Sequence, residues 1–451
     1  MQRRRAAVGA GQHVPLGVEP GPRAVDRAWW VVATAVALLS ASLLLAGVLP
    51  SPSEPVTPLT APDQTAPDQA QEARLTEALT FDEDVLADVT AYRSPRRMMA
   101  LASQLIGVAV PLAIGALLLG GRGGRGLRLR VPLALPLALQ VGVAAALVVL
   151  ATALVRLPLA VGAGVVQDGA WGFRTRSVPG WALDHLLVVS GRALGLGLLV
   201  AAVVALAVRH PRTWPARVSV LVAVVGPLAL LLHPLAVHPL LLPTGPMPDG
   251  EHRDAVVAVV ARSGVDVPVL LGEASLRTTR RNAVVTGLGP TQRVVLHDTL
   301  LELGPREVAA ITAHELAHIE RRDPLRGVLA PVPVVLIAGL LARRRLAGGV
   351  DLRVAAAVVA LVLAAEAALT PVAAAVSRTI EHRTDVRSVA LSADADAHAA
   401  LLRTFVIDGL ADPDPPRWSV LLWATHPAPA HRIRTVLSAD DDPSTLHPAT
   451  R

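Results

Sequence analysis

The chain has 451 residues, of which 52% are hydrophobic and only 17% are charged. Its mean hydropathy of +0.50 is too high for an ordinary soluble protein, so the composition predicts a membrane body with a modest soluble part. The 42 basic residues are all arginine, but no basic stripe interleaved with aromatic residues is present, so we expect no nucleic-acid partner. The absence of cysteine excludes disulfides and thiolate metal sites, so a zinc ion would need histidine and carboxylate ligands.

The N-terminal part is predicted to hold a tail, an anchor and a loop. Residues 1–27 form a basic tail, and the apolar run at about 28–49 is the first candidate span. A cleaved signal peptide is the alternative for this run, because it ends in small residues, but its length and the tail before it favour a retained anchor. Residues 50–99 are rich in proline and acidic residues and are predicted to be a solvated loop that turns into a short helix.

Further apolar runs of about 20 residues predict a polytopic protein. The first membrane region covers 28–242 with about five spans, and two further spans are expected within 326–376. The candidate spans after the first are at about 100–120, 131–155, 183–208, 217–242, 326–342 and 352–376. The predicted fold is therefore a mainly α-helical membrane protein with about seven spans.

Two polar blocks are interrupted by the last two spans, so a soluble domain would be assembled from two separated pieces. The first block, 243–325, is expected to hold a hairpin and a helix, and the second block is 377–437. The last residues, 438–451, are predicted to be a disordered tail.

The motif "HELAH" at 314–318 lies in a segment with helical periodicity. On a helix, His314 and His318 share a face and can hold one metal ion, whereas Glu315 is offset and can reach a water on that ion. Zinc lowers the pKa of its water and polarises a scissile carbonyl, and Glu315 would take the proton. The alternative is a surface helix with two ordinary histidines, and a chance match of this kind arises on the order of once in a hundred sequences.

A protease zinc needs a third protein ligand and an open fourth position. In "SRTIEHRTDVRSVAL", just beyond the last span, Glu381 and Asp385 are four residues apart on one helix face. Glu381 would complete a two-histidine, one-glutamate site, and Asp385 would orient a histidine ring through its free N–H. Taken alone, this stretch is more typical of an exposed helix with alternating charges.

These motifs together resemble the integral-membrane zinc metallopeptidases of the CaaX prenyl protease and HtpX type. Three further stretches carry the same resemblance. "RRNAVVTGLGPTQRVVLHDTLLE" at 280–302 is similar to the hairpin before the zinc helix, and "WATHPAPAHRIRTV" at 423–436 is similar to the C-terminal His-Pro segment. "WGFRTRSVPGWALDHL" at 171–186 resembles an element of the CaaX protease membrane region, although Arg174 stands where asparagine is usual, which leaves prenylated substrates open.

The resemblance implies a zincin-like α+β domain, one Zn²⁺ per chain and further site residues. The run "AVVT" would be an edge strand on which Asn282, Ala283 and Val284 hold an extended substrate through the backbone. His426 would donate a hydrogen bond to the oxyanion, and Arg432 would pair with a carboxylate near the site or contact substrate. Without the resemblance, the same residues read as a plain hairpin and a loop histidine.

Two charged residues lie inside candidate spans, namely Arg192 and Glu366. Such residues usually face the interior of a bundle or water. The resemblance to CaaX proteases implies a water-filled chamber enclosed by helices. We therefore expect Arg192 and Glu366 to line such a chamber, where they can pair.

The predicted function is a zinc metalloendopeptidase of the cell membrane that acts on membrane-associated or misfolded polypeptides. Its expected partners are a peptide or protein substrate and the lipid bilayer. One alternative is a membrane sensor that uses a zinc-protease domain, but a sensor should carry an added binding domain of about 100 residues, which the sequence lacks. The other alternative is an inactive scaffold, against which Glu315 and every expected ligand are present.

The arginines conflict with the resemblance over orientation. If the spans alternate, the N-terminal tail and the short basic loops at 121–130, 209–217 and 343–353 lie on one side. Short basic loops stay cytoplasmic, which would put the soluble domain outside. The prenyl protease resemblance implies a cytoplasmic domain instead, so the sequence leaves both orientations open.

Overall fold

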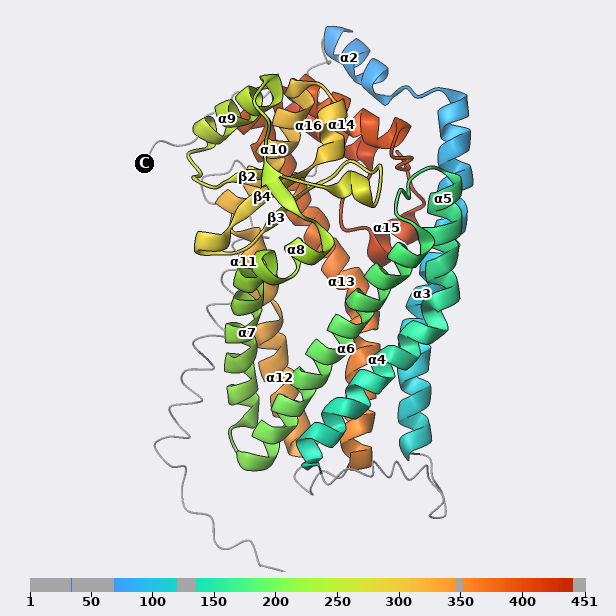
Figure 1. The fold of residues 1–451 in the computed structure, drawn as a ribbon, viewed down its shortest axis with the longest axis vertical. Helices are drawn as coiled ribbons and strands as arrows, with labels where there is room; N and C mark the ends of the chain where they lie inside the picture. The colour runs from blue at the N-terminus through green and yellow to red at the C-terminus, as the bar shows by residue number, and fades with distance from the viewer. Residues whose placement is uncertain (1–33, 35–68, 120–134, 346–351, 441–451) are drawn as a thin grey trace, which may run out of the picture.

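The computed structural model describes Thr34 and residues 69–119, 135–345 and 352–440. Long helices form a bundle, and a smaller domain with a four-stranded sheet covers one end of it (Figure 1). The predicted fold class, a mainly α-helical polytopic membrane protein with a small α+β domain, is confirmed. Apart from Thr34, the candidate first span lies outside the described residues, and the predicted count of seven spans is not confirmed.

The bundle consists of long helices, together with short helices at their ends. Their bounds are α3 (Glu83–Leu119), α4 (Leu137–Val161), η1 (Gly162–Gln167), α5 (Asp168–Ala170), α6 (Val178–Arg209), α7 (Trp214–Ala236), α8 (His238–Leu241), α11 (Asp323–Leu329), α12 (Pro331–Arg345) and α13 (Leu352–Ser392). Five stretches of the described residues have the length and hydropathy of a span, and α11 with α12 makes one of them. The 41-residue α13 begins in the predicted seventh span and continues into the small domain.

The small domain is assembled from the two predicted pieces, with one short helix added from the N-terminal side. Its elements are α2 (Gln69–Leu79), β1 (Thr244–Pro246), α9 (Glu251–Ser263), β2 (Val269–Gly272), η2 (Ala274–Leu276), β3 (Ala283–Thr286), η3 (Gly289–Thr291), β4 (Arg293–His297), η4 (Asp298–Glu302), α10 (Pro305–Glu320), α14 (Ala395–Ile407), α15 (Arg417–Trp423) and α16 (Pro429–Asp440). Helix α16 extends into the predicted tail, whose remaining residues lie outside the described part.

The prediction of a loop over the whole of 50–99 is wrong for its last part, because α3 already begins at Glu83. The charges of this segment lower its hydropathy, but they belong to a helix that leaves the bundle and contacts the small domain. Arg97 pairs with Asp412 at 2.6 Å, and Arg96 pairs with Asp168 at 2.8 Å. The expected short helix is present as α2, which packs on α14 and α16.

The connections between the described spans alternate between the two ends of the bundle. Helix α3 ends and α4 begins at the end away from the small domain, and the α6–α7 connection, the end of α12 and the beginning of α13 lie there as well (Figure 1). Arg212 lies in the α6–α7 connection, Arg209 ends α6, and Arg217 lies near the start of α7. Arg343 donates a hydrogen bond to the Arg212 carbonyl. Described arginines of two predicted basic loops therefore gather at the same end.

The sheet has the strand order β1-β2-β4-β3, in which β2 and β4 are parallel and the other pairs antiparallel. The β-branched run of β3 pairs with β4 in a hairpin, with Val284 opposite Val295. Gly287 turns this hairpin with φ of 82°, and a Cβ there would lie 2.1 Å from the Thr291 carbonyl oxygen. In the described sheet β3 stands at the end of the order, so its outer edge is unpaired, as predicted.

Helix α10 lies in the core of the small domain and packs against α9, α13 and α14. Leu316 and Val308 on α10 are fully buried, together with Leu296 and Leu300 from the neighbouring β4 and η4. His314 and Glu315 are also buried and His318 is partly buried, which contradicts the alternative of a surface helix with two ordinary histidines.

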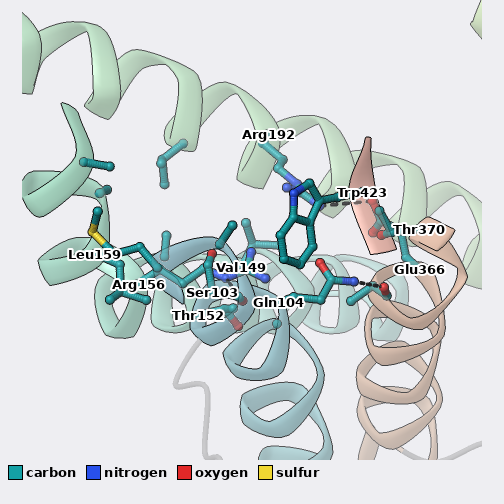
Figure 2. Close-up of a pocket in the computed structure, with 18 of the residues that line it drawn as sticks. Ser103, Gln104, Val149, Thr152, Arg156, Leu159, Arg192, Glu366, Thr370 and Trp423 are labelled. Atoms are coloured by element: carbon teal, nitrogen blue, oxygen red, sulfur yellow. Dashed lines mark hydrogen bonds and ion pairs between the residues drawn. The ribbon is translucent and has the colours of Figure 1, made fainter. Parts of the chain in front are cut away.

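Helices α3, α4, α6 and α13 contribute side chains to a cavity of about 740 Å³ within the bundle (Figure 2). Arg192 and Glu366 both line it, and the Arg192 Nη2 to Glu366 Oε1 distance is 3.0 Å. The structure thus places Arg192 and Glu366 as the expected pair in the lining of a cavity.

Candidate metal centre

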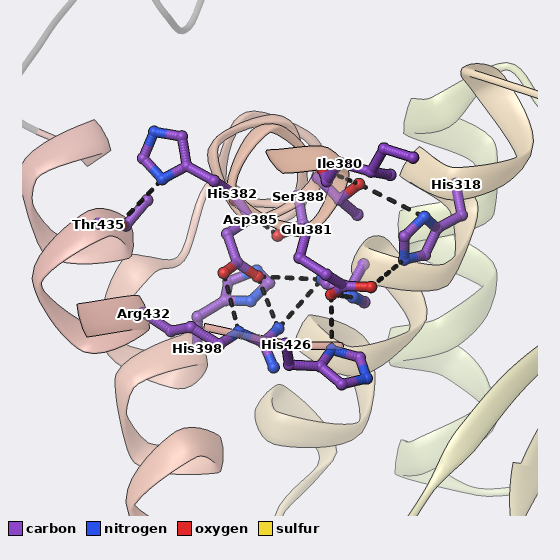
Figure 3. Close-up of polar contacts among 12 residues, drawn as sticks. His318, Ile380, Glu381, His382, Asp385, Ser388, His398, His426, Arg432 and Thr435 are labelled. Carbon is purple, nitrogen blue, oxygen red and sulfur yellow. Dashed lines mark hydrogen bonds and ion pairs between the residues drawn. The ribbon is translucent and has the colours of Figure 1, made fainter. Parts of the chain in front are cut away.

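Three side chains from two helices converge at the small domain. His314 and His318 lie one turn apart on α10, and Glu381 reaches them from α13. Figure 3 shows Glu381 facing His318. Glu381 Oε2 is 3.3 Å from His314 Nε2, and Glu381 Oε1 is 3.5 Å from His318 Nε2. One ligand atom from each residue lies within 4.8 Å of the others, so a single ion can contact all three.

The other ring nitrogen of each histidine contacts a carboxylate. His314 Nδ1 is 3.1 Å from Asp385 Oδ1, and His318 Nδ1 is 2.9 Å from Asp323 Oδ2. A carboxylate at Nδ1 holds the proton there and leaves the Nε2 lone pair for a metal. Both rings are therefore fixed with Nε2 facing Glu381.

Sequence reasoning misses Asp323, because the pattern marks it only as the end of the zinc helix. It lies five residues after His318 and therefore not on the same helix face. The chain turns at Arg322, whose φ is 57°, and this left-handed turn brings Asp323 back against His318. The spacing alone gives no signal for this contact.

Arg432 holds Asp385 in place. Its Nε and Nη2 donate to the two Asp385 oxygens at 2.8 and 2.6 Å, a bidentate pair in which Asp385 is buried and Arg432 is partly buried. Of the two roles expected for Arg432, pairing with a carboxylate near the site is the one that this geometry favours. The chain of contacts runs from Arg432 through Asp385 to His314.

The site's electrostatics favour a cation. Burial lowers the pKa of His318, but contacts with Asp323 and Glu381 outweigh it and raise that pKa to about 10. Burial alone would raise the pKa of Glu381, but His314, His318 and His426 hold that pKa far below its usual range. Burial would also raise the pKa of Asp385, but Arg432 holds that pKa well below its usual range. Without a metal, the rings bind protons that a divalent ion would displace.

The donor set fits a divalent metal ion. Glu381 Oε2 is buried and has no hydrogen-bond partner, because its close ring nitrogens do not meet it with hydrogen-bond geometry. An unsatisfied buried carboxylate oxygen is costly, and an ion between the three ligands would satisfy it. Two imidazole nitrogens with one carboxylate are a donor set typical of catalytic zinc.

Glu315 lies beside these ligands on α10 and is buried. Its carboxylate makes no hydrogen bond or ion pair with any residue that the structure describes. It lines the same groove as the three ligands, so it can accept a proton from a molecule bound there.

The ligands open into a groove of about 930 Å³. One wall carries Asn282, Ala283 and Val284, and therefore includes the unpaired edge of β3. His426 lines the same groove, is 56% exposed and has its Nδ1 2.8 Å from Glu381 Oε2. All the catalytic, metal-binding and substrate-binding residues predicted from the sequence thus line one groove.

His398 on α14 is a buried histidine that the sequence does not single out. It is 4% exposed, contacts Ser392 Oγ through Nε2 at 3.0 Å, and burial lowers its pKa to about 4. The unfolded chain, with an ordinary histidine pKa of about 6.5, binds this proton more readily than the folded chain.

We therefore expect acid to destabilise the protein through His398. As the pH falls from about 6.5 towards 4, the folded state should lose roughly 3 kcal/mol relative to the unfolded state. Thermal unfolding of the wild type and His398→Gln, followed across this range, measures the effect. The variant should show a flatter dependence of the unfolding midpoint on pH, and equal slopes would contradict this role for His398.

A fold in which spanning helices support a buried histidine and carboxylate cluster beside a peptide-sized groove defines a membrane metallopeptidase. Residues 251–440 match the model of Peptidase family M48. An uncharacterized metalloprotease of Bacillus subtilis, YhfN, is 26% identical over 311 residues, which cover 65% of this chain and 72% of that protein. These matches support an M48 metallopeptidase of the CaaX prenyl protease and HtpX type, as the resemblance predicted.

Two further relatives agree with this assignment. CAAX prenyl protease 1 of Saccharomyces cerevisiae is 28% identical over 180 residues, which cover 39% of this chain and 40% of that protein. The crystal structure of S. mikatae Ste24p superposes with a TM-score of 0.63 at 18% identity, covering 90% of this chain and 98% of that one. At this identity the superposition shows a shared fold that includes the membrane bundle.

Proposed function

We propose that the chain is a zinc endopeptidase that hydrolyses peptide bonds of membrane-associated or misfolded polypeptides. The observation that supports this most strongly is the convergence of His314, His318 and Glu381 at a groove that also exposes Glu315. A bundle of apolar helices beneath the groove favours substrates that are close to a membrane.

In this proposal each side chain of the site has a chemical task. His314, His318 and Glu381 would hold the ion, which when bound would polarise the scissile carbonyl and lower the pKa of a water. Glu315 would take the proton of the attacking water and pass it to the leaving amine. His426 would donate a hydrogen bond to the developing oxyanion.

The surrounding residues would position the substrate and the ligands. The unpaired edge of β3 can add an extended peptide as a further strand, which holds the chain straight across the groove. Asp385 and Asp323 fix the two imidazole rings, and Arg432 fixes Asp385. Arg432 thus acts as a positioning residue in this proposal.

Removal of the metal tests the proposed function. We expect 1,10-phenanthroline to abolish cleavage of β-casein by the purified protein, and about one equivalent of Zn²⁺ to restore it. Metal content, measured by plasma mass spectrometry on the same samples, should fall and recover with activity. Cleavage that persists after the metal has been removed would contradict a zinc endopeptidase.

We also propose that the far end of the bundle faces the cytoplasm and the groove lies on the opposite side. The described arginines at the α6–α7 connection and Arg343 lie at that far end, and short basic connections favour the cytoplasm. A fluorescent-protein fusion at residue 125 should then report a cytoplasmic position, and an alkaline phosphatase fusion at residue 451 an external one. Reporters on the same side at both points would refute this topology.

A further inference from the structure

The cavity in the bundle contains a positive charge that the proposed function does not use. Arg156 lies on α4 inside a spanning stretch and lines the cavity. Its Nε donates to the Ser103 carbonyl of α3 at 2.9 Å, and its terminal nitrogens make no hydrogen bond with the described residues. A carbonyl satisfies one donor but does not neutralise the guanidinium.

The neighbouring helix leaves room for this side chain. At Gly107 on α3, a Cβ would lie 1.8 Å from Arg156 Nη2, so any larger residue would displace the guanidinium. The nearby carboxylate of Glu366 already pairs with Arg192. Among the described residues, Arg156 therefore has no acidic partner of its own.

An arginine in a spanning segment is costly unless it meets an opposite charge or water. Water in the cavity can solvate it, but a carboxylate forms a stronger, charge-assisted contact with the planar guanidinium. The terminal nitrogens of Arg156 are available for such a contact. The unpaired guanidinium of Arg156 therefore favours the binding of an anionic ligand in the cavity.

The cavity and the groove at the metal centre share part of their lining. Arg93, Arg97 and Trp423 line both, and the indole of Trp423 lies beside Arg192 and Gln104 at the cavity (Figure 2). Arg97 is neutralised by Asp412, whereas Arg93 donates to the carbonyl of Leu410 and has no acidic partner among the described residues. The groove and the cavity therefore adjoin at these three residues, one of which is an arginine without an acidic partner among the described residues.

We propose that the cavity is a substrate subsite in which Arg156 binds a carboxylate of the polypeptide being cleaved. The carboxylate is either the C-terminal group or an aspartate or glutamate side chain. The shared lining favours a substrate chain over an acidic lipid headgroup, because only the former must occupy both spaces at once. This inference rests on the proposed function.

A library of proteome-derived peptides tests the subsite, because it presents acidic and neutral sequences to the protein together. The purified, zinc-loaded protein in nanodiscs is incubated with the library, and mass spectrometry gives the residues around each cut. We expect about tenfold enrichment of a carboxylate at a fixed distance from the cut, and its loss in Arg156→Gln and Gly107→Ala. Arg156→Lys should retain most of it, and Arg253→Gln, an exposed change in α9, should retain all of it.

A second arm uses the same library with amidated C-termini. Loss of the enrichment in the amidated library assigns the C-terminal carboxylate, and persistence assigns an acidic side chain. A third arm measures retention of fluorescent acidic and neutral peptides, which requires no cleavage. Retention of acidic peptides should fall about tenfold in Arg156→Gln, while neutral peptides are unaffected.

These arms separate the subsite from the proposed function. Without cleavage by the wild type, the endopeptidase proposal fails, but Arg156-dependent retention of acidic peptides would still support the subsite. The subsite is overturned if Arg156→Gln keeps the carboxylate preference, or if it weakens all peptides equally. It is also overturned if Arg156 controls only the retention of phosphatidylglycerol, measured by native mass spectrometry.

Discussion

Replacing Glu315 with glutamine should abolish peptide hydrolysis and leave the metal in place. Glutamine keeps the size of the side chain in its buried position on α10, but it cannot accept the proton of the attacking water. Loss of a general base costs about 100- to 10,000-fold in rate, so we expect a fall in kcat of about a thousandfold. The measurement is β-casein cleavage under single-turnover conditions, with metal content determined on the same protein.

Glu320→Gln is the matched control for this change. Glu320 is on the same helix but pairs with Arg387 at 2.8 Å, away from the ligands. The Glu320→Gln variant should cleave at nearly the wild-type rate. The change removes only an exposed ion pair, which contributes about 0–1 kcal/mol to stability, and it leaves the ligands untouched. If Glu315→Gln cleaved like Glu320→Gln, Glu315 would not be the base. Unchanged metal content with no cleavage even in the wild type would instead favour the inactive scaffold.

Replacing Glu381 with glutamine should remove most of the metal affinity. The change withdraws the negative charge that faces both imidazoles at 3.3 and 3.5 Å and leaves only two histidine ligands. Loss of a residue that merely orients a ligand costs about 10- to 100-fold in affinity, and we expect loss of the ligand itself to cost more. Competition with a chromophoric zinc chelator measures the dissociation constant.

Asp323→Asn provides the comparison, because Asp323 contacts His318 Nδ1 without reaching the space between the ligands. We expect it to weaken zinc by about 10- to 100-fold and Glu381→Gln to weaken zinc further. The reverse order of the two variants would show that the ion does not sit between Glu381 and the histidines.

Local periodicity is sufficient to predict part of the centre. Two histidines four apart must share a face on any helix, so the motif alone pairs His314 with His318. Glu381 is a different case, because its stretch alone reads as an exposed helix. The family resemblance predicts its role, and the structure supplies the contact because α13 runs from the bundle into the small domain.

Other features depend on backbone geometry that the sequence does not display. Asp323 meets His318 only through a left-handed turn at Arg322. Helix α3 already begins at Glu83, and its Arg97 pairs with Asp412 of the small domain, a contact that hydropathy does not predict. Arg156 follows directly after the predicted end of a span, but α4 continues to Val161 and places it inside the bundle.

The central claim is that one divalent ion is shared by His314, His318 and Glu381. Anomalous diffraction at the zinc edge, from crystals of the zinc-loaded protein, tests it most directly. The predicted result is a single peak within roughly 2.0–2.2 Å of both Nε2 atoms and of a Glu381 oxygen. A peak bound elsewhere, or a Glu381 side chain that turns away from a metal held by the two histidines, would contradict it.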